Sequence, residues 1–198
     1  MTSFITIVIT SPDKISSESS LIVELIESGA VDFVHLRKPG FSLKEMKCLI
    51  DSIPESIHGH LRLHSHFALL NEYNLAGAHL NSRCPDLPVN ARSLTKSCHS
   101  LDEIYNAASQ FEYFTLSPVF DSISKSGYKA KFNLKELKGK FGTQTVIGLG
   151  GIIPSLFPIL YQAGFAGAAM LGYVWRQPER KNEIIKEIQK YKNLCCSI

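Results

Sequence analysis

With 198 residues, of which 44% are hydrophobic and 20% charged, the chain has the length and composition of one globular domain with a full core. A net charge of +3, without a stripe of Lys and Arg, argues against nucleic acid as a partner. Five cysteines at no zinc or disulfide spacing, and an N-terminus without a secretory signal, predict reduced thiols in a cytoplasmic protein.

Eight short runs rich in apolar and β-branched residues predict β-strands. In chain order they are Phe4–Thr10, Asp32–Arg37, His60–His64, Gly77–Leu80, Leu94–Cys98, Tyr113–Ser117, Val146–Leu149 and Gly167–Leu171. Apolar stripes and helix caps predict helices after most of these runs. The helical segments are Leu21–Ile26, Leu43–Ile50, Phe67–Tyr73, Ser100–Ser109, Asn133–Lys140, Ser155–Gln162 and Glu179–Lys192. Residues 81–92 and 121–131 are expected to be loops.

The stretch Thr143–Trp175 carries no charged residue and is long enough to cross a bilayer. Two prolines and six glycines interrupt it, however, at spacings that a smooth helix would not choose. A strand, a helix and a second strand fit it better, as one β-α-β unit. We therefore expect no membrane span.

Alternation of strands and helices implies parallel pairing, and eight such units fit a closed (βα)8 barrel. The sequence thus predicts one TIM-barrel domain over residues 1–198, with short loops. An open doubly wound sheet is the alternative.

In such a barrel the site gathers at the carboxyl ends of the strands. Arg37 ends a buried strand, where a guanidinium could grip an anion or form an ion pair with Asp32 or Glu27. Backbone N–H groups in the turns after the last two strands could bind a phosphate, although these glycines could equally serve only the turns. The turn glycines are Gly150, Gly151 and Gly172.

Other polar residues at the strand ends give weaker signals. Ser122, Ser124 and Lys125 alternate in a way that suits phosphate oxygens, but a solvated loop would look the same. His64 and His66 have no third ligand at metal spacing, so zinc is not expected.

Six segments in chain order resemble motifs of the thiamine-phosphate synthase family. They are Val34–Arg37, Gly77–Leu80, Ser97–Glu103, Pro118–Lys125, Leu149–Ile152 and Gly167–Gly172. The resemblance implies a (βα)8 barrel that joins hydroxymethylpyrimidine diphosphate to thiazole phosphate, with Mg²⁺ assistance. It also implies small-molecule phosphate and diphosphate substrates as partners, and it leaves a homo-oligomer open.

Matched positions imply roles for individual residues. Arg37 and Lys125 would hold the diphosphate, with Ser97 as a polar contact beside it. The thiazole phosphate would lie against Ser122, Ser124, Gly150, Gly151, Leu171 and Gly172. His35 and His64 stand where the family has Gln and Asn, and they are candidate substrate-binding residues.

Two departures concern the metal. Ser65 stands where the family has an Mg²⁺-binding aspartate, and Asp86 is the candidate for the second carboxylate, which predicts a weakened Mg²⁺ site. Two alternatives to synthase activity stay open. A thiazole tautomerase of the same family would need a histidine where this chain has Pro118, unless His35 or His64 moves the proton. A non-catalytic binder of thiazole or thiamine phosphate is the other.

Overall fold

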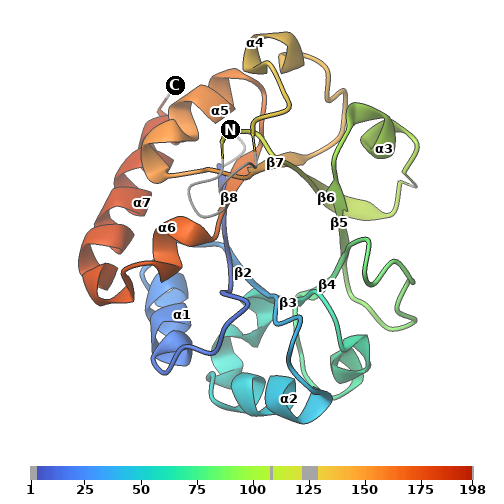
Figure 1. Ribbon diagram of the computed structural model, residues 1–198, viewed down its shortest axis with the longest axis vertical. Coiled ribbons are helices and arrows are strands. Elements are labelled where there is room, and N and C mark those ends of the chain that lie inside the picture. Colours follow the sequence, from blue (N-terminus) through green and yellow to red (C-terminus); the bar gives the residue numbers. More distant parts are fainter. Residues whose placement is uncertain (1–3, 108, 122–128, 198) are drawn as a thin grey trace.

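Eight parallel strands form a closed barrel in the computed structural model, which describes residues 4–107, 109–121 and 129–197 (Figure 1). The strands are β1 (Ile5–Ile9), β2 (Phe33–Leu36), β3 (Leu61–Leu63), β4 (Gly77–Leu80), β5 (Leu94–Cys98), β6 (Phe111–Leu116), β7 (Val146–Leu149) and β8 (Gly167–Met170). Each strand pairs with the next, and β8 pairs with β1. The predicted TIM barrel is confirmed, and the open sheet is excluded.

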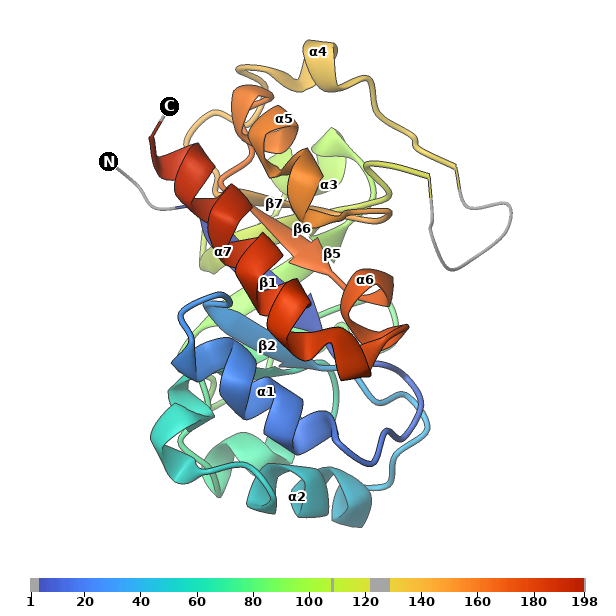
Figure 2. The same ribbon diagram turned by 90° about the vertical axis from the view of Figure 1, so that its left-hand side faces the viewer.

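Helices surround this ring of strands (Figures 1 and 2). The α-helices are α1 (Glu18–Glu27), α2 (Leu43–Asp51), α3 (Leu101–Tyr105), α4 (Leu134–Leu137), α5 (Phe157–Gln162), α6 (Gly172–Trp175) and α7 (Lys181–Cys196). Short 3-10 helices are η1 (Glu55–His60), η2 (Phe67–Asn71), η3 (Pro154–Leu156) and η4 (Pro178–Arg180). No described helix is long and apolar enough to cross a bilayer.

The N-terminal caps of α2 and α3 differ. At α2 the Ser42 hydroxyl accepts from the Glu45 N–H, and the Glu45 carboxylate accepts from the Ser42 N–H, so the box is complete. At α3 the Ser100 hydroxyl accepts from the Glu103 N–H, but the Glu103 carboxylate accepts from the N–H of His99 instead. Helix α3 ends at Tyr105 and is therefore shorter than the predicted segment Ser100–Ser109.

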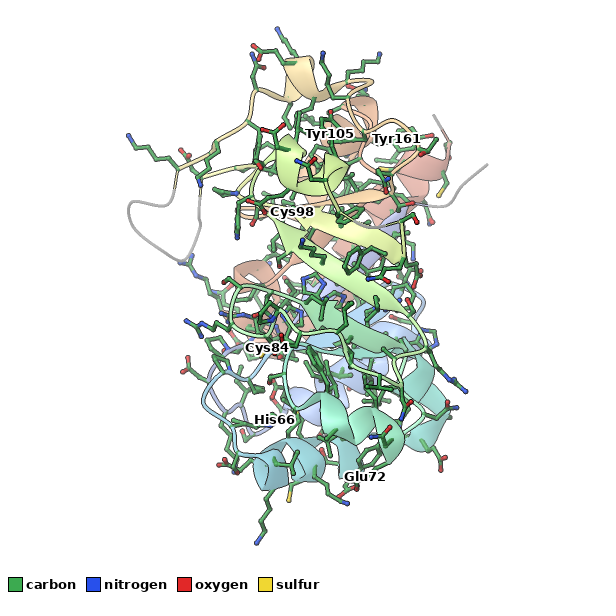
Figure 3. All side chains as sticks on the ribbon, turned by 90° about the vertical axis from the view of Figure 1, so that its right-hand side faces the viewer. His66, Glu72, Cys84, Cys98, Tyr105 and Tyr161 are labelled. Atoms are coloured by element: carbon green, nitrogen blue, oxygen red, sulfur yellow. The ribbon has the colours of Figure 1, made fainter. Side chains whose placement is uncertain are left out.

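Other helix boundaries also moved. Helix α4 is shorter than predicted, whereas α7 extends to Cys196. The one-turn helix α6 was not predicted, because Gly172 suggested a turn. Residues 81–93 contain no helix, as expected, so the β4–β5 side of the barrel has only loop cover (Figure 3).

The inside of the barrel divides into an apolar and a polar half. Side chains alternate along a strand, so every second residue points inward. Strands β1, β7 and β8 contribute a small apolar cluster that includes Ile7, Ile147 and Ala169. Strands β2 to β6 contribute buried polar groups instead, namely His35, Arg62, His64, His79, Thr95 and Thr115.

Arg62 is 1% exposed. Its guanidinium pairs with Glu112, donates to Ser93 and lies about 5 Å from the rings of Phe33 and Tyr113. These contacts compensate a buried charge, which would otherwise be costly.

Candidate functional site

A cavity of about 820 Å³ opens where the carboxyl ends of the strands meet. Every strand, or the loop that follows it, contributes lining residues. Among them are Ile9, Arg37, His64, Ser65, Asn81, Arg83, Ser97, His99, Ser117, Gly150, Gly151, Leu171, Gly172 and Trp175. A volume of this size suits a small-molecule ligand or a pair of them.

Positive charge dominates the cavity wall. Arg37 and Arg83 both line it, and no described carboxylate lies within ion-pair distance of either guanidinium. Burial and the neighbouring charge of Arg83 lower the pKa of Arg37 from its usual value. The alternative partner Asp32 instead pairs with Lys192 at 2.8 Å. Arg37 is therefore available to an anionic ligand rather than used in an ion pair with Asp32.

Lys38 also lines the cavity, but its charge is already compensated. Its ammonium lies 2.6 Å from the Glu18 carboxylate and donates to the Asp13 carbonyl at 2.7 Å. Both side chains of the Lys38–Glu18 pair are nearly inaccessible to solvent. The pair holds the start of α1 and the β1–α1 loop against the end of β2, beside Arg37.

The predicted glycine turns lie at the rim of the cavity. Gly151 has φ +65°, and a Cβ there would lie 2.1 Å from the carbonyl oxygen of Asp121. The loop after β6 donates from Val119 and Phe120 to the carbonyls of Leu149 and Gly150. Only glycine at 151 lets the loop after β6 lie this close to the turn after β7. The same close packing places the backbone of Gly151 at the cavity.

Three histidines from neighbouring strands meet at the floor of the cavity. Nδ1 of His35 lies 2.9 Å from Nε2 of His64, and Nε2 of His35 lies 2.7 Å from the Tyr113 hydroxyl. His79 contacts the hydroxyl of Thr95 at 2.8 Å and that of Ser97 at 2.9 Å. His64 and Ser97 line the cavity, whereas His35 is fully buried beneath it and does not.

Burial keeps these imidazoles neutral. It lowers the pKa of His35 and His64 well below the usual value, and that of His79 to about 3. Positive charge adds to the effect, from Arg62 on His35 and His79 and from Arg37 on His64. Each ring therefore offers one N–H donor and one acceptor nitrogen.

With this geometry in view, comparison with known proteins identifies the family. The chain matches the thiamine monophosphate synthase family (TMP-TENI) over residues 6–174. The chain belongs to this family. No curated protein sequence matches it.

Two solved structures of thiamine phosphate pyrophosphorylases resemble this family member. The one from Bacteroides thetaiotaomicron is 31% identical, with a TM-score of 0.82, over 96% of this chain and 98% of that one. The one from Pyrococcus furiosus is 17% identical, with a TM-score of 0.79, over 98% of each chain. A 3-hexulose-6-phosphate synthase is 13% identical, with a TM-score of 0.59, over 93% of this chain and 98% of that one, and shares the fold alone.

The described residues do not form the Mg²⁺ site that the family implies. Ser65 lines the cavity, and its hydroxyl is buried without a hydrogen-bond partner. Asp86 is exposed and lies outside the cavity, so the structure does not bring the two candidates together. Asp13 is the sole carboxylate among the described lining residues. Mg²⁺ prefers several oxygen ligands that include carboxylates, and a wall rich in guanidinium groups does not suit it.

The other site predictions for this family member fall into two groups. Arg37, His64, Ser65, Ser97, Gly150, Gly151, Leu171 and Gly172 share the cavity wall. Ser122, Ser124 and Lys125 lie outside the described residues. Sequence reasoning missed Arg83 and His99, which also line the cavity; for Arg83 the available signal was its place two residues after Asn81, which follows β4.

Proposed function

We propose that this protein is a thiamine-phosphate synthase, which joins hydroxymethylpyrimidine diphosphate to thiazole phosphate and releases diphosphate. One observation carries the proposal. The cavity of this family member is lined by the guanidinium groups of Arg37 and Arg83, neither of which has a described carboxylate partner, and its rim is lined by glycines. Both substrates are anionic, so this wall is complementary to each. We also propose that the protein works in the cytoplasm, where its five cysteines would stay reduced.

The two anions would occupy different parts of the wall. Arg37 and Arg83 would hold the diphosphate through charge-assisted hydrogen bonds. Backbone N–H groups at Gly151 and Gly172 would hold the thiazole phosphate. By the family resemblance, Lys125 would join Arg37 at the diphosphate, and Ser122 and Ser124 would join the glycine backbone at the thiazole phosphate.

In the proposed reaction the C–O bond to the diphosphate breaks, and the electron pair leaves with the oxygen. The ring nitrogen of the thiazole then attacks the pyrimidine-stabilised cation. The work of the protein is to stabilise the leaving negative charge and to exclude water. Arg37 and Arg83 serve the first task, and the apolar wall of Ile9, Leu149 and Trp175 serves the second.

The test is incubation of the purified protein with both substrates, at millimolar Mg²⁺ and in EDTA, with product identification by mass spectrometry. Thiamine phosphate should form only when both substrates are present. Arg37→Ala should lose most of the rate. If both substrates bind by calorimetry but no product forms under either condition, the protein is a binder and the proposal is wrong.

A further inference from the structure

Three histidines from neighbouring strands come together inside the barrel. His35 belongs to β2 and His79 to β4, and His64 directly follows β3, which pairs with both of these strands. One ring nitrogen from each histidine lies within 4.8 Å of the others, and all three residues are buried. The closed sheet therefore assembles a group of imidazoles that no spacing along the chain reveals.

His66, which alternates with His64 in the sequence, is not a member of this group. Its Nε2 lies 2.8 Å from the carbonyl oxygen of Phe41, away from the other rings. The sequence analysis looked for a third ligand near these two residues, whereas the barrel brings His64 together with histidines of two other strands. The group must therefore be judged from its geometry in the fold.

Hydroxyl groups outside the group hold two of the rings in place. Nε2 of His35 lies 2.7 Å from the Tyr113 hydroxyl, and Nδ1 of His79 lies 2.8 Å from the Thr95 hydroxyl. Thr95 donates to the Ala78 carbonyl at 3.3 Å, so its oxygen accepts the Nδ1–H of His79. Nε2 of His79 then carries the lone pair. A metal-bound histidine is held in the same way, by a hydrogen bond from its distal N–H.

The nitrogens on the inner side of these rings face the same space. Nδ1 of His35 lies 2.9 Å from Nε2 of His64, and Nε2 of His79 lies 2.9 Å from the Ser97 hydroxyl. Both His64 and Ser97 line the cavity. The lone pairs of the group are thus directed to a point at the floor of the cavity, next to the space for a ligand.

We propose that His35, His64 and His79 bind one divalent transition-metal ion of the zinc class, with an open position toward the cavity. Three imidazole nitrogens without a carboxylate suit Zn²⁺, Co²⁺ or Ni²⁺, whereas Mg²⁺ requires oxygen ligands. A phosphate oxygen of a bound substrate would complete the coordination, and the ion would polarise that oxygen. The site deepens the proposed function and rests on it only for the identity of this anion.

One ring has to turn for the three nitrogens to share an ion. The rings of His64 and His79 are stacked, with centroids 4.3 Å apart and an interplanar angle of 28°. Tetrahedral Zn–N bonds of about 2.0–2.1 Å place two ligand nitrogens about 3.3 Å apart. His64 is the ring that can turn, because its Nδ1 has no hydrogen-bond partner among the described residues and its Nε2 contacts only another member of the group.

Nearby positive charge makes binding of the ion depend on an anion. Arg62, whose charge acts on His35 and His79, is already paired with Glu112. Arg37 on the cavity wall has no described carboxylate partner and repels a cation. An anion in the cavity would neutralise both Arg37 and the ion. Metal and anion should therefore strengthen each other's binding by the same factor.

The test is titration of the full chain, dialysed first against EDTA and then against buffer, with Co²⁺ and Zn²⁺. One equivalent of Co²⁺ should bind and give visible absorption bands, without the intense near-ultraviolet band that thiolate ligands produce. Zn²⁺ should displace Co²⁺, whereas millimolar Mg²⁺ should not. Pyrophosphate should tighten Co²⁺ binding and shift the visible bands, because it takes the open position.

Variants assign the ligands and the hydroxyl that orients one of them. His79→Gln should abolish stoichiometric Co²⁺ binding, whereas His99→Gln, which changes another histidine of the cavity wall, should bind as wild type does. Thr95→Val should weaken Co²⁺ binding on the order of 10–100-fold, and Thr95→Ser should keep it. Thr115→Val is the matched control, because Thr115 is equally buried inside the barrel. Circular dichroism confirms folding of each variant.

Four results would overturn the site: no Co²⁺ or Zn²⁺ binding by the folded wild type, a thiolate band, equal binding by wild type and folded His79→Gln, or equal affinities of Thr95→Val and Thr115→Val. The proposed function fails separately. Co²⁺ binding that His79→Gln abolishes, in a wild type that forms no thiamine phosphate, would keep the metal site and overturn the synthase activity.

Discussion

At the scale of single residues, the chemistry depends on which charges are already compensated. Lys38 and Arg37 are adjacent in the sequence, yet Lys38 is paired with Glu18 and Arg37 has no described carboxylate partner. Besides burial, the charge that lowers its pKa is that of another cation, Arg83. Two like charges facing one cavity repel each other until an anion binds, so an anion gains affinity from both.

Arg37→Ala should lose affinity for one of the two anionic ligands selectively. The variant should bind pyrophosphate more weakly by on the order of 2–4 kcal/mol, because a desolvated charged contact is lost. Binding of thiazole phosphate should change far less. Titration calorimetry measures both, with the surface variant Arg180→Ala as the control. Equal losses for the two ligands would show that Arg37 has a structural role.

Ser65 provides a second prediction at this scale. Its buried hydroxyl has no hydrogen-bond partner and lines the cavity, so an aspartate there would add the missing oxygen ligands for Mg²⁺. Ser65→Asp should bind pyrophosphate worse in EDTA, because of like-charge repulsion, and better at millimolar Mg²⁺. Ser65→Asn, equal in size and neutral, is the control. Identical Mg²⁺ titrations for Ser65→Asp and wild type would remove Ser65 as the vacant ligand position.

At the scale of elements, the Lys38–Glu18 pair joins α1 to the end of β2. Burial raises the pKa of Glu18, although the hydrogen bond and charge of Lys38 oppose this. Loss of one partner would leave an uncompensated buried charge. We expect Lys38→Met to lower the free energy of unfolding by about 3–5 kcal/mol in chemical denaturation. The double variant with Glu18→Gln should recover much of that loss.

The exposed pair of Lys181 with Glu24 offers a matched comparison. Lys181→Met should cost at most about 1 kcal/mol, because solvent screens that pair. A similar cost for Lys38→Met and Lys181→Met would mean that the buried pair is dispensable.

The elements also show what the sequence could and could not predict. Alternating strands and helices have local periodicities, so the barrel and the wall residues at the strand ends were predictable. The buried contact between His35 and Tyr113 was not, because the two residues are 78 apart in the sequence and meet only through the barrel. Arg83 was missed because it lies in a loop without periodicity. Helix α6 was missed because four residues carry too little pattern to separate a helix from a turn.

At the scale of the whole molecule, the barrel keeps three neutral histidines in its interior. Their pKa values are lowered in the folded state, whereas the unfolded chain titrates at about 6.5. Below that pH the unfolded state binds more protons than the folded state, so stability falls as the pH falls. For His79 the window runs from about 6.5 down to its folded pKa of about 3.

Each buried histidine should contribute a slope of at most about 1.4 kcal/mol per pH unit within this window. The measurement is urea denaturation between pH 6.5 and 5, above the range in which most carboxylates titrate. His35→Gln removes one buried imidazole, so its curve should be shallower by about one proton. His60→Gln removes an exposed imidazole and is the control for the loss of a histidine as such. If the His35→Gln curve also runs parallel to wild type, His35 gains its proton in the folded barrel as readily as in the unfolded chain, and burial does not lower its pKa.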